Sequence, residues 1–138
     1  MWPLLLVALL PPKPGPYIGT LPPGGIIVED MAFGPQLPLT CTWFSNFENS
    51  RFDHCRGPAG NVLPSDGGAS LKCVDRICEQ LDAEARKAAH TRGIEAPEGT
   101  FTVRFTGRVS VHQHQPQYLG DGTSTVLIEK LVSVRKAK

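Results

Sequence analysis

The chain has 138 residues, 41% of them hydrophobic and 20% charged, with 14 Lys and Arg against 13 Asp and Glu. This length fits one modest globular domain. A formal net charge of +1 argues against a polybasic nucleic-acid-binding protein and excludes an acidic disordered tail. The 14 glycines and 13 prolines exceed average usage, which excludes a mostly helical chain.

The N-terminal part of the sequence differs in character from the rest. Residues 1–10 form an apolar run without a charge, and residues 11–16 read Pro-Pro-Lys-Pro-Gly-Pro, which suits neither a helix nor a central strand. The run is too short to cross a bilayer, which takes about 20 residues. Its length matches the core of an export signal, although a basic start and a small-residue cleavage site are missing. We therefore expect residues 1–16 to be an atypical export signal and linker, with a hydrophobic strand or flexible end as the alternative. Residues 17–138 should form a single small β-rich domain.

Four cysteines in a small chain with an export-like start favour disulfides over free thiols. The segment between Cys41 and Cys55 folds back naturally about Glu48. In that arrangement the two cysteines lie opposite each other, and Trp43 lies opposite Asp53. A cross-strand disulfide fits this geometry and should stabilise the fold by about 3 kcal/mol.

The second pair, Cys73 and Cys78, needs a special arrangement. Inside one α-helix the two residues would be separated by about 7.5 Å of axial rise, too far for a bridge. A bond between them therefore requires Cys73 to precede the helix. Of the three pairings of four cysteines, we favour Cys41 with Cys55 and Cys73 with Cys78. Zinc is the rival interpretation, but the spacings match no Cys-x-x-Cys knuckle.

The periodicity of apolar residues predicts one helix and several strands. Apolar residues at three- and four-residue intervals predict a helix over about 75–92, ended by Gly93. Strict alternation predicts a long strand over 100–114, in which Gly107 falls in the apolar row and indicates a bend or bulge. The segment 125–134 lacks alternation, which is typical of a strand covered on both faces. Shorter candidate strands are 17–21, 25–29, 39–44, 51–55 and 70–74.

This order of elements predicts a mainly β domain with one helix (α+β), built as a small antiparallel barrel or roll of five to six strands. The order β-β-β-α-β-β resembles the OB-fold, a five-stranded Greek-key barrel with its helix between the third and fourth strands. The resemblance covers about residues 17–134. The alternative is a roll in which the helix packs across one face of an antiparallel sheet.

Polar side chains on the even-numbered face of the predicted 100–114 strand form one row that could hold an anionic ligand: Arg104, Arg108, His112 and His114. The OB-fold resemblance implies ligand binding on the second and third strands and on the loops after strands one and four. The later of these loops would be 115–123, with Tyr118 as a stacking surface and Asp121 as a polar contact. The alternative is that these side chains simply face water.

Catalytic and metal-binding patterns are weak in this sequence. His112 and His114 have the spacing of two ligands on one face of a strand for zinc or copper, with His54 or Asp121 as conceivable third ligands. The chain contains no G-x-S-x-G, H-E-x-x-H or phosphate-loop motif. We therefore expect a protein that is not an enzyme and uses no cofactor or metal.

Together these features predict a small exported, non-catalytic binding or accessory module of a bacterial-type cell envelope, periplasmic or secreted. Its partner would be a small molecule, a glycan or an envelope protein, while nucleic acid and a transmembrane span are not expected. Two alternatives stay open. One is a small metal-dependent hydrolase centred on His112 and His114, and the other is a purely structural envelope protein.

Overall fold

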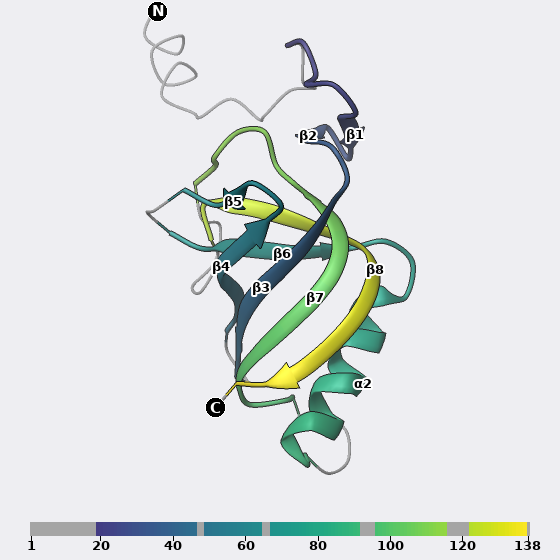
Figure 1. Cartoon of the computed structure of the whole chain (residues 1–138), viewed down its shortest axis with the longest axis vertical. Helices are drawn as coiled ribbons and strands as arrows, with labels where there is room; N and C mark the ends of the chain where they lie inside the picture. The colour runs from purple at the N-terminus through teal and green to yellow at the C-terminus, as the bar shows by residue number, and fades with distance from the viewer. Residues whose placement is uncertain (1–18, 47–48, 65–66, 92–95, 116–121, 138) are drawn as a thin grey trace, which may run out of the picture.

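The computed structural model describes residues 19–46, 49–64, 67–91, 96–115 and 122–137 (Figure 1). The expected leader, residues 1–16, lies outside this part of the chain. Within it, the protein is mainly β with one helix, as predicted. The elements are β1 (Ile26–Val28), β2 (Met31–Phe33), β3 (Leu37–Ser45), β4 (Ser50–Gly57), β5 (Gly60–Asn61), β6 (Ala69–Cys73), α2 (Ile77–Ala89), β7 (Gly99–Val109) and β8 (Ser124–Lys136).

The main sheet closes on itself. Its strands follow in the order β3, β7, β8, β6, β4 and β5, and β3 also pairs with β4, which makes a ring (Figure 1). β1 and β2 form a separate hairpin. Contrary to the expected antiparallel sheet, β6 and β8 run parallel. Parallel pairing requires a long crossover, and the crossover here contains α2 and β7.

The short strands were predicted with mixed success. Residues 19–21 of the candidate strand 17–21 are not a strand, and its first two residues lie outside the described part. The other four short candidates correspond to β1, β3, β4 and β6 with shifts at their ends. β2 and β5 were not predicted.

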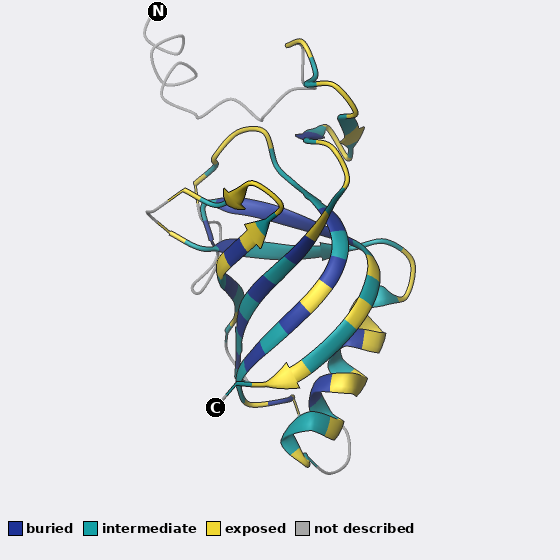
Figure 2. Ribbon diagram, in the orientation of Figure 1, coloured by how far each residue is buried: buried dark blue, intermediate teal, exposed yellow. Residues whose placement is uncertain are grey.

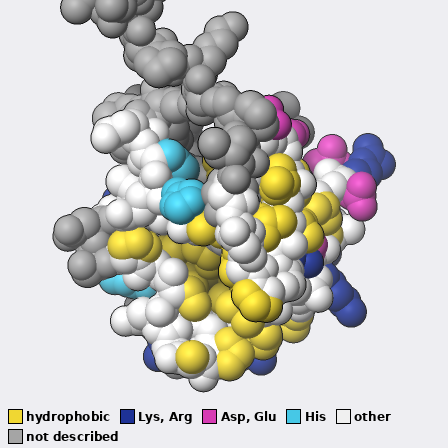
Figure 3. Space-filling model, turned by 90° about the horizontal axis from the view of Figure 1, so that it is seen from above, with side chains coloured by type: hydrophobic (Ala, Val, Ile, Leu, Met, Phe, Trp, Pro, Cys, Tyr) yellow, Lys and Arg dark blue, Asp and Glu magenta, His cyan; other side chains and the backbone are white. Residues whose placement is uncertain are grey.

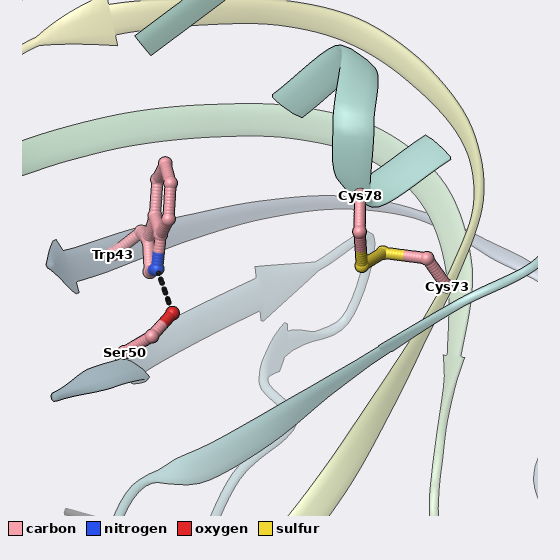
Figure 4. Close-up of a disulfide and its surroundings, with 4 residues drawn as sticks. All are labelled: Trp43, Ser50, Cys73 and Cys78. Atoms are coloured by element: carbon pink, nitrogen blue, oxygen red, sulfur yellow. Dashed lines mark hydrogen bonds between the residues drawn. A yellow bond between two sulfur atoms is a disulfide. The ribbon is translucent and has the colours of Figure 1, made fainter. Parts of the chain in front are cut away.

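The ring encloses an aromatic core, which forms because alternate residues of each strand face inward (Figure 2). Trp43 packs against Phe101 with ring centroids 5.3 Å apart, and Phe52 stacks on Phe105 at 5.5 Å. The Trp43 indole N–H donates a 2.9 Å hydrogen bond to Ser50 Oγ (Figure 4). The one polar atom of this buried ring is therefore satisfied.

The β3–β4 hairpin contains the first disulfide and a β-bulge. Cys41 lies opposite Cys55 and is bonded to it, as expected. From Trp43 onward the expected register is wrong, because Trp43 lies opposite Phe52 instead of Asp53. Asp53 is the extra residue of the bulge. Phe52 and Cys55 are three positions apart and would face opposite sides of a regular strand. The bulge lets both face the core.

β7 confirms the predicted alternation but ends earlier than expected. Its odd-numbered residues from Phe101 to Gly107 are buried, and the strand stops at Val109 instead of 114. The pairing with β8 shifts register at Gly107, where a Cβ would lie 2.2 Å from the Leu127 carbonyl oxygen and 2.8 Å from the Phe105 ring. The expected irregularity is therefore present, and the close approach of β8 explains why a side chain is missing there.

β8 changes character along its length. Ser124 to Ile128 are all buried, as expected for a strand covered on both faces, whereas the residues from 129 onward include exposed side chains. Glu129 and Val132 are left without partners in the register with β7. These two irregularities let the strand bend around the ring (Figure 1).

α2 is shorter than the predicted 75–92 helix and ends differently. It stops at Ala89 because His90 adopts a left-handed conformation with φ 55°, and the Thr91 N–H then reaches back to the Arg86 carbonyl at 2.9 Å. This is a Schellman-type end, whereas the predicted stop, Gly93, lies outside the described residues.

The inner face of α2 buries Leu81 and Ala85 against the ring. Cys73 precedes the helix, as the spacing required, and its disulfide to Cys78 joins the end of β6 to the start of α2 with a Cα–Cα distance of 5.5 Å (Figure 4). Both favoured cysteine pairings are thus present.

Replacing Phe105 by Ala should lower the free energy of unfolding by about 3–5 kcal/mol, because it removes an enclosed ring and leaves a cavity. Arg104→Ala, on the exposed side of the same strand, should change it by less than about 0.5 kcal/mol. Urea denaturation measures both values. Equal effects would mean that the inner and outer faces of β7 are assigned wrongly.

Gly107→Ala should destabilise the fold by about 1–3 kcal/mol, because the added methyl group would overlap the β8 backbone. Gly34→Ala is a matched control, since a Cβ there makes only an ordinary 3.6 Å contact with the Val109 carbonyl oxygen. The two melting temperatures should differ clearly, with the Gly107 variant lower. Identical values would contradict the close approach of β8 at Gly107.

Candidate functional site

Arg108, one of the predicted ligand-binding residues, already has its side-chain partners within the fold. Its Nε lies 2.8 Å from Glu129 Oε1, and its Nη1 donates to the carbonyl oxygens of Gly24 at 2.7 Å and Gly34 at 3.2 Å. The side chains of Arg108 and Glu129 are only 13% and 19% exposed. Arg108 therefore ties the β1–β2 region to the main sheet, and its charge is already neutralised by Glu129.

Other contacts support the same attachment. Gly34 N–H donates to the Val109 carbonyl, and Val111 N–H donates to the Ala32 carbonyl, both at 2.9 Å. Lys72 of β6 pairs with Glu29 in the turn of the hairpin. The hairpin thus covers one end of the sheet, where it buries Ala32 and Phe33.

The two predicted histidines do not continue the row of Arg104. Because β7 ends at Val109, His112 and His114 lie in the connection that follows it. His114 Nε2 lies 2.8 Å from Thr125 Oγ1, and its Nδ1 lies 3.2 Å from the Gln115 carbonyl. Histidine side chains are visible beside hydrophobic ones on the face seen in Figure 3. Tyr118 and Asp121 lie outside the described residues.

Of the predicted residues that the structure describes, Arg104 is the one that points outward from the sheet with its charge exposed. Directly paired residues of neighbouring strands share a face, and the register therefore identifies its neighbours. We call the following outward residues of β3, β4, β7 and β8 the basic face: Thr40, Thr42, His54, Arg56, Thr102, Arg104, Thr106, Lys130, Ser133 and Arg135. Along β3 and β7, half-buried or exposed positions alternate with buried ones (Figure 2).

The centre of the basic face is a row that crosses four strands. Thr40 of β3 lies opposite Arg56 of β4 and also opposite Arg104 of β7. Arg104 in turn lies opposite Ser133 of β8. Two guanidinium groups therefore flank a threonine on one surface, an arrangement suited to an anionic group. Arg56, Thr40 and Ser133 were not among the predicted site residues.

The charges of this face are not neutralised by neighbours that the structure describes. Arg56, Arg104, Lys130 and Arg135 make no ion pair within the described ranges. The acidic groups of the same strands are engaged elsewhere. Asp53 pairs with Arg51 at 2.8 Å, and Glu129 pairs with Arg108. The surface consequently has an excess of positive charge.

A groove adjoins the β4 end of the row. It has a volume of about 510 Å³ and is lined by Pro38, Thr40, Arg56, Gly57, Pro58 and Gly60. This volume is within the usual range of ligand sites, although the groove is open to solvent. Two prolines and two glycines give it a mostly uncharged wall, and Arg56 supplies a cation at its edge.

The structure gives less support to a metal site or to a catalytic carboxyl. Within the described ranges, no three His, Cys, Asp or Glu residues are grouped so that they could hold a metal ion. Burial raises the pKa of the Asp82 carboxyl above its usual value, and the charge of Arg86 opposes that shift. A shifted carboxyl can mark an active site, but Asp82 lies on α2 and does not belong to the basic face.

None of the helical residues that the structure describes forms a segment with the length and apolarity of a membrane span. Comparison of the chain with known protein families, with curated proteins and with solved structures finds no match.

Arg108→Met should destabilise the protein by about 1–3 kcal/mol, because it leaves the partly buried Glu129 carboxylate without its ion-pair partner. The amides of Gly34 and Val111 should exchange with solvent faster as the hairpin detaches, which hydrogen exchange measures. Arg104→Met, the same change four residues earlier on β7, is the control and should leave both amides protected. Wild-type protection of both amides in the Arg108 variant would contradict this prediction, because other contacts would then hold the hairpin on the sheet without Arg108.

Proposed function

We propose that this protein is a small exported, non-catalytic binding module of a bacterial-type cell envelope that holds an anionic ligand on its basic face. The observation that carries the proposal is the row of Arg56, Thr40 and Arg104, in which two exposed cations stand on either side of a hydroxyl. Two disulfides stabilise the domain and suit an oxidising compartment outside the cytoplasm.

We also propose that the closed sheet is an OB-like arrangement. The five strands of the ring are β3, β4, β6, β7 and β8, and α2 follows the third of them in chain order. This order supports the resemblance to the OB-fold, whose ligands bind on the second and third strands. Here these are β4 and β6, and the basic face shares β4 with that surface. The β1–β2 hairpin and β5 are additions to that order.

The geometry favours binding over metal-dependent hydrolysis. A hydrolytic metal site needs three protein ligands and an open position. His112 and His114 lie in a connection instead of on one face of a strand, and His114 Nε2 already contacts the Thr125 hydroxyl. The basic face offers exposed cations and hydroxyl groups, which suit the holding of an anion.

Loss of the central cations should abolish most of the binding. The double variant Arg56→Ala/Arg104→Ala should bind dextran sulfate about tenfold or more weakly than the unsubstituted protein at low salt, because two charge-assisted contacts are lost. Isothermal titration calorimetry measures the affinities.

The control for this experiment is the double variant Arg76→Ala/Arg86→Ala, which removes two positive charges at α2 instead of on the basic face. This control should bind as the unsubstituted protein does. If both double variants weaken binding equally, attraction follows net charge alone and the basic face is not the site.

A further inference from the structure

We infer that the ligand of the basic face is an acidic polysaccharide that lies across the strands from β4 to β8. This inference rests on the proposed function and names the class of ligand for the same surface. Four observations on the described residues lead to it: the spacing of the cations, the hydroxyl groups between them, the scarcity of aromatic rings and the groove beside Arg56.

The cations of the face are widely spaced. Arg56 and Arg104 stand in one row two strands apart, a separation of about 9.5 Å at the usual distance between strands. The next cations, Lys130 and Arg135, belong to β8, one strand further. Each strand of a DNA duplex carries a phosphate for about every 3.4 Å of helix axis. The wider spacing suits a polymer whose anionic groups are separated by neutral units.

Hydroxyl groups fill the space between these cations. Thr40 lies between Arg56 and Arg104, and Ser133 lies beyond Arg104 in the same row. Thr42, Thr102 and Thr106 occupy the neighbouring rows, and all five hydroxyl residues are half-buried. A hydroxyl both donates and accepts hydrogen bonds, as do the hydroxyl groups of a neutral sugar. The alternation of cation and hydroxyl therefore matches an alternation of acidic and neutral sugars.

Aromatic rings are scarce on this surface. Among the outward positions described on β3, β4, β7 and β8, Phe44 is the one phenylalanine, tyrosine or tryptophan, and the Arg51 guanidinium lies over its ring at 5.6 Å. Proteins that bind single-stranded nucleic acids stack bases on exposed aromatic rings. The basic face has one such ring among its described outward neighbours, which argues against a single-stranded nucleic acid as the ligand.

The groove provides a place for one end of the polysaccharide. It begins at Arg56 and is bounded by Pro38 and Pro58, whose rings offer apolar walls to the C–H face of a sugar. A polysaccharide that starts in the groove and crosses the row would meet Arg56, then Arg104, and then Lys130 or Arg135. The β8 cations are therefore reached only by longer chains.

The test uses hyaluronan oligosaccharides of increasing length, which carry one carboxylate per disaccharide, with calorimetry at constant ionic strength. We expect affinity to rise with length until the chain reaches β8. The longest oligosaccharide should bind about tenfold more tightly than an oligodeoxynucleotide of equal charge. Lys130→Ala/Arg135→Ala should weaken the long oligosaccharide about fivefold or more and leave the disaccharide unchanged. Arg76→Ala/Arg86→Ala, with the same loss of charge on α2, should keep the full dependence on length.

The possible outcomes separate the inference from the proposed function. Equal or tighter binding of the oligodeoxynucleotide, or equal affinity for short and long oligosaccharides, would overturn the inference and leave an anion-binding face intact. Unchanged length dependence in the Lys130/Arg135 variant would overturn the path across β8. If neither polymer nor dextran sulfate binds, both the inference and the proposed function are wrong.

Discussion

β3 is hydrogen-bonded on both sides along most of its length, to β4 on one edge and to β7 on the other, and the closure of the sheet depends on that double pairing. It brings together segments about 60 residues apart in sequence, Leu37–Ser45 and Gly99–Val109. The inner residues of β3 then face those of β4 and β7 in one enclosed core. The outer residues of the same three strands necessarily share a surface, so the core and the basic face have a common origin.

Much of this fold could be predicted from local sequence patterns. Alternation identified β7, the three- and four-residue periodicity identified α2, and helix geometry required Cys73 to precede the helix. What could not be predicted depends on contacts distant in sequence. The end of β7 is set by the hairpin, where Phe33 forms a bridge with Ser110. The hairpin itself turns at Glu29 and Asp30, both with positive φ, without the glycine that usually marks such a turn.

In the candidate site too, local patterns predicted some features, and contacts distant in sequence determine the others. Alternation correctly indicated that Arg104 faces outward, but it gave no sign that Glu129 and two carbonyl groups surround Arg108, because those partners come from three other segments. Thr40 and Arg56 could have been recognised from sequence as neighbours on one face. The predicted pairing of Cys41 with Cys55 also places positions 40 and 56 opposite each other. That Arg104 joins this pair follows only from the register of β3 with β7, for which the sequence contains no local signal.

The two disulfides bridge residues only 14 and 5 positions apart. Each bond fastens a hairpin or a strand–helix corner, and neither crosses from β3 to β7 or from β6 to β8. The covalent links are thus local, while the long-range pairings that close the ring are entirely non-covalent. A single cut of the backbone between α2 and β7 would divide the protein into two fragments. The N-terminal fragment would keep both disulfides, and the C-terminal fragment would contain β7 and β8. Their reassociation would then measure how strongly the closing contacts alone hold the ring.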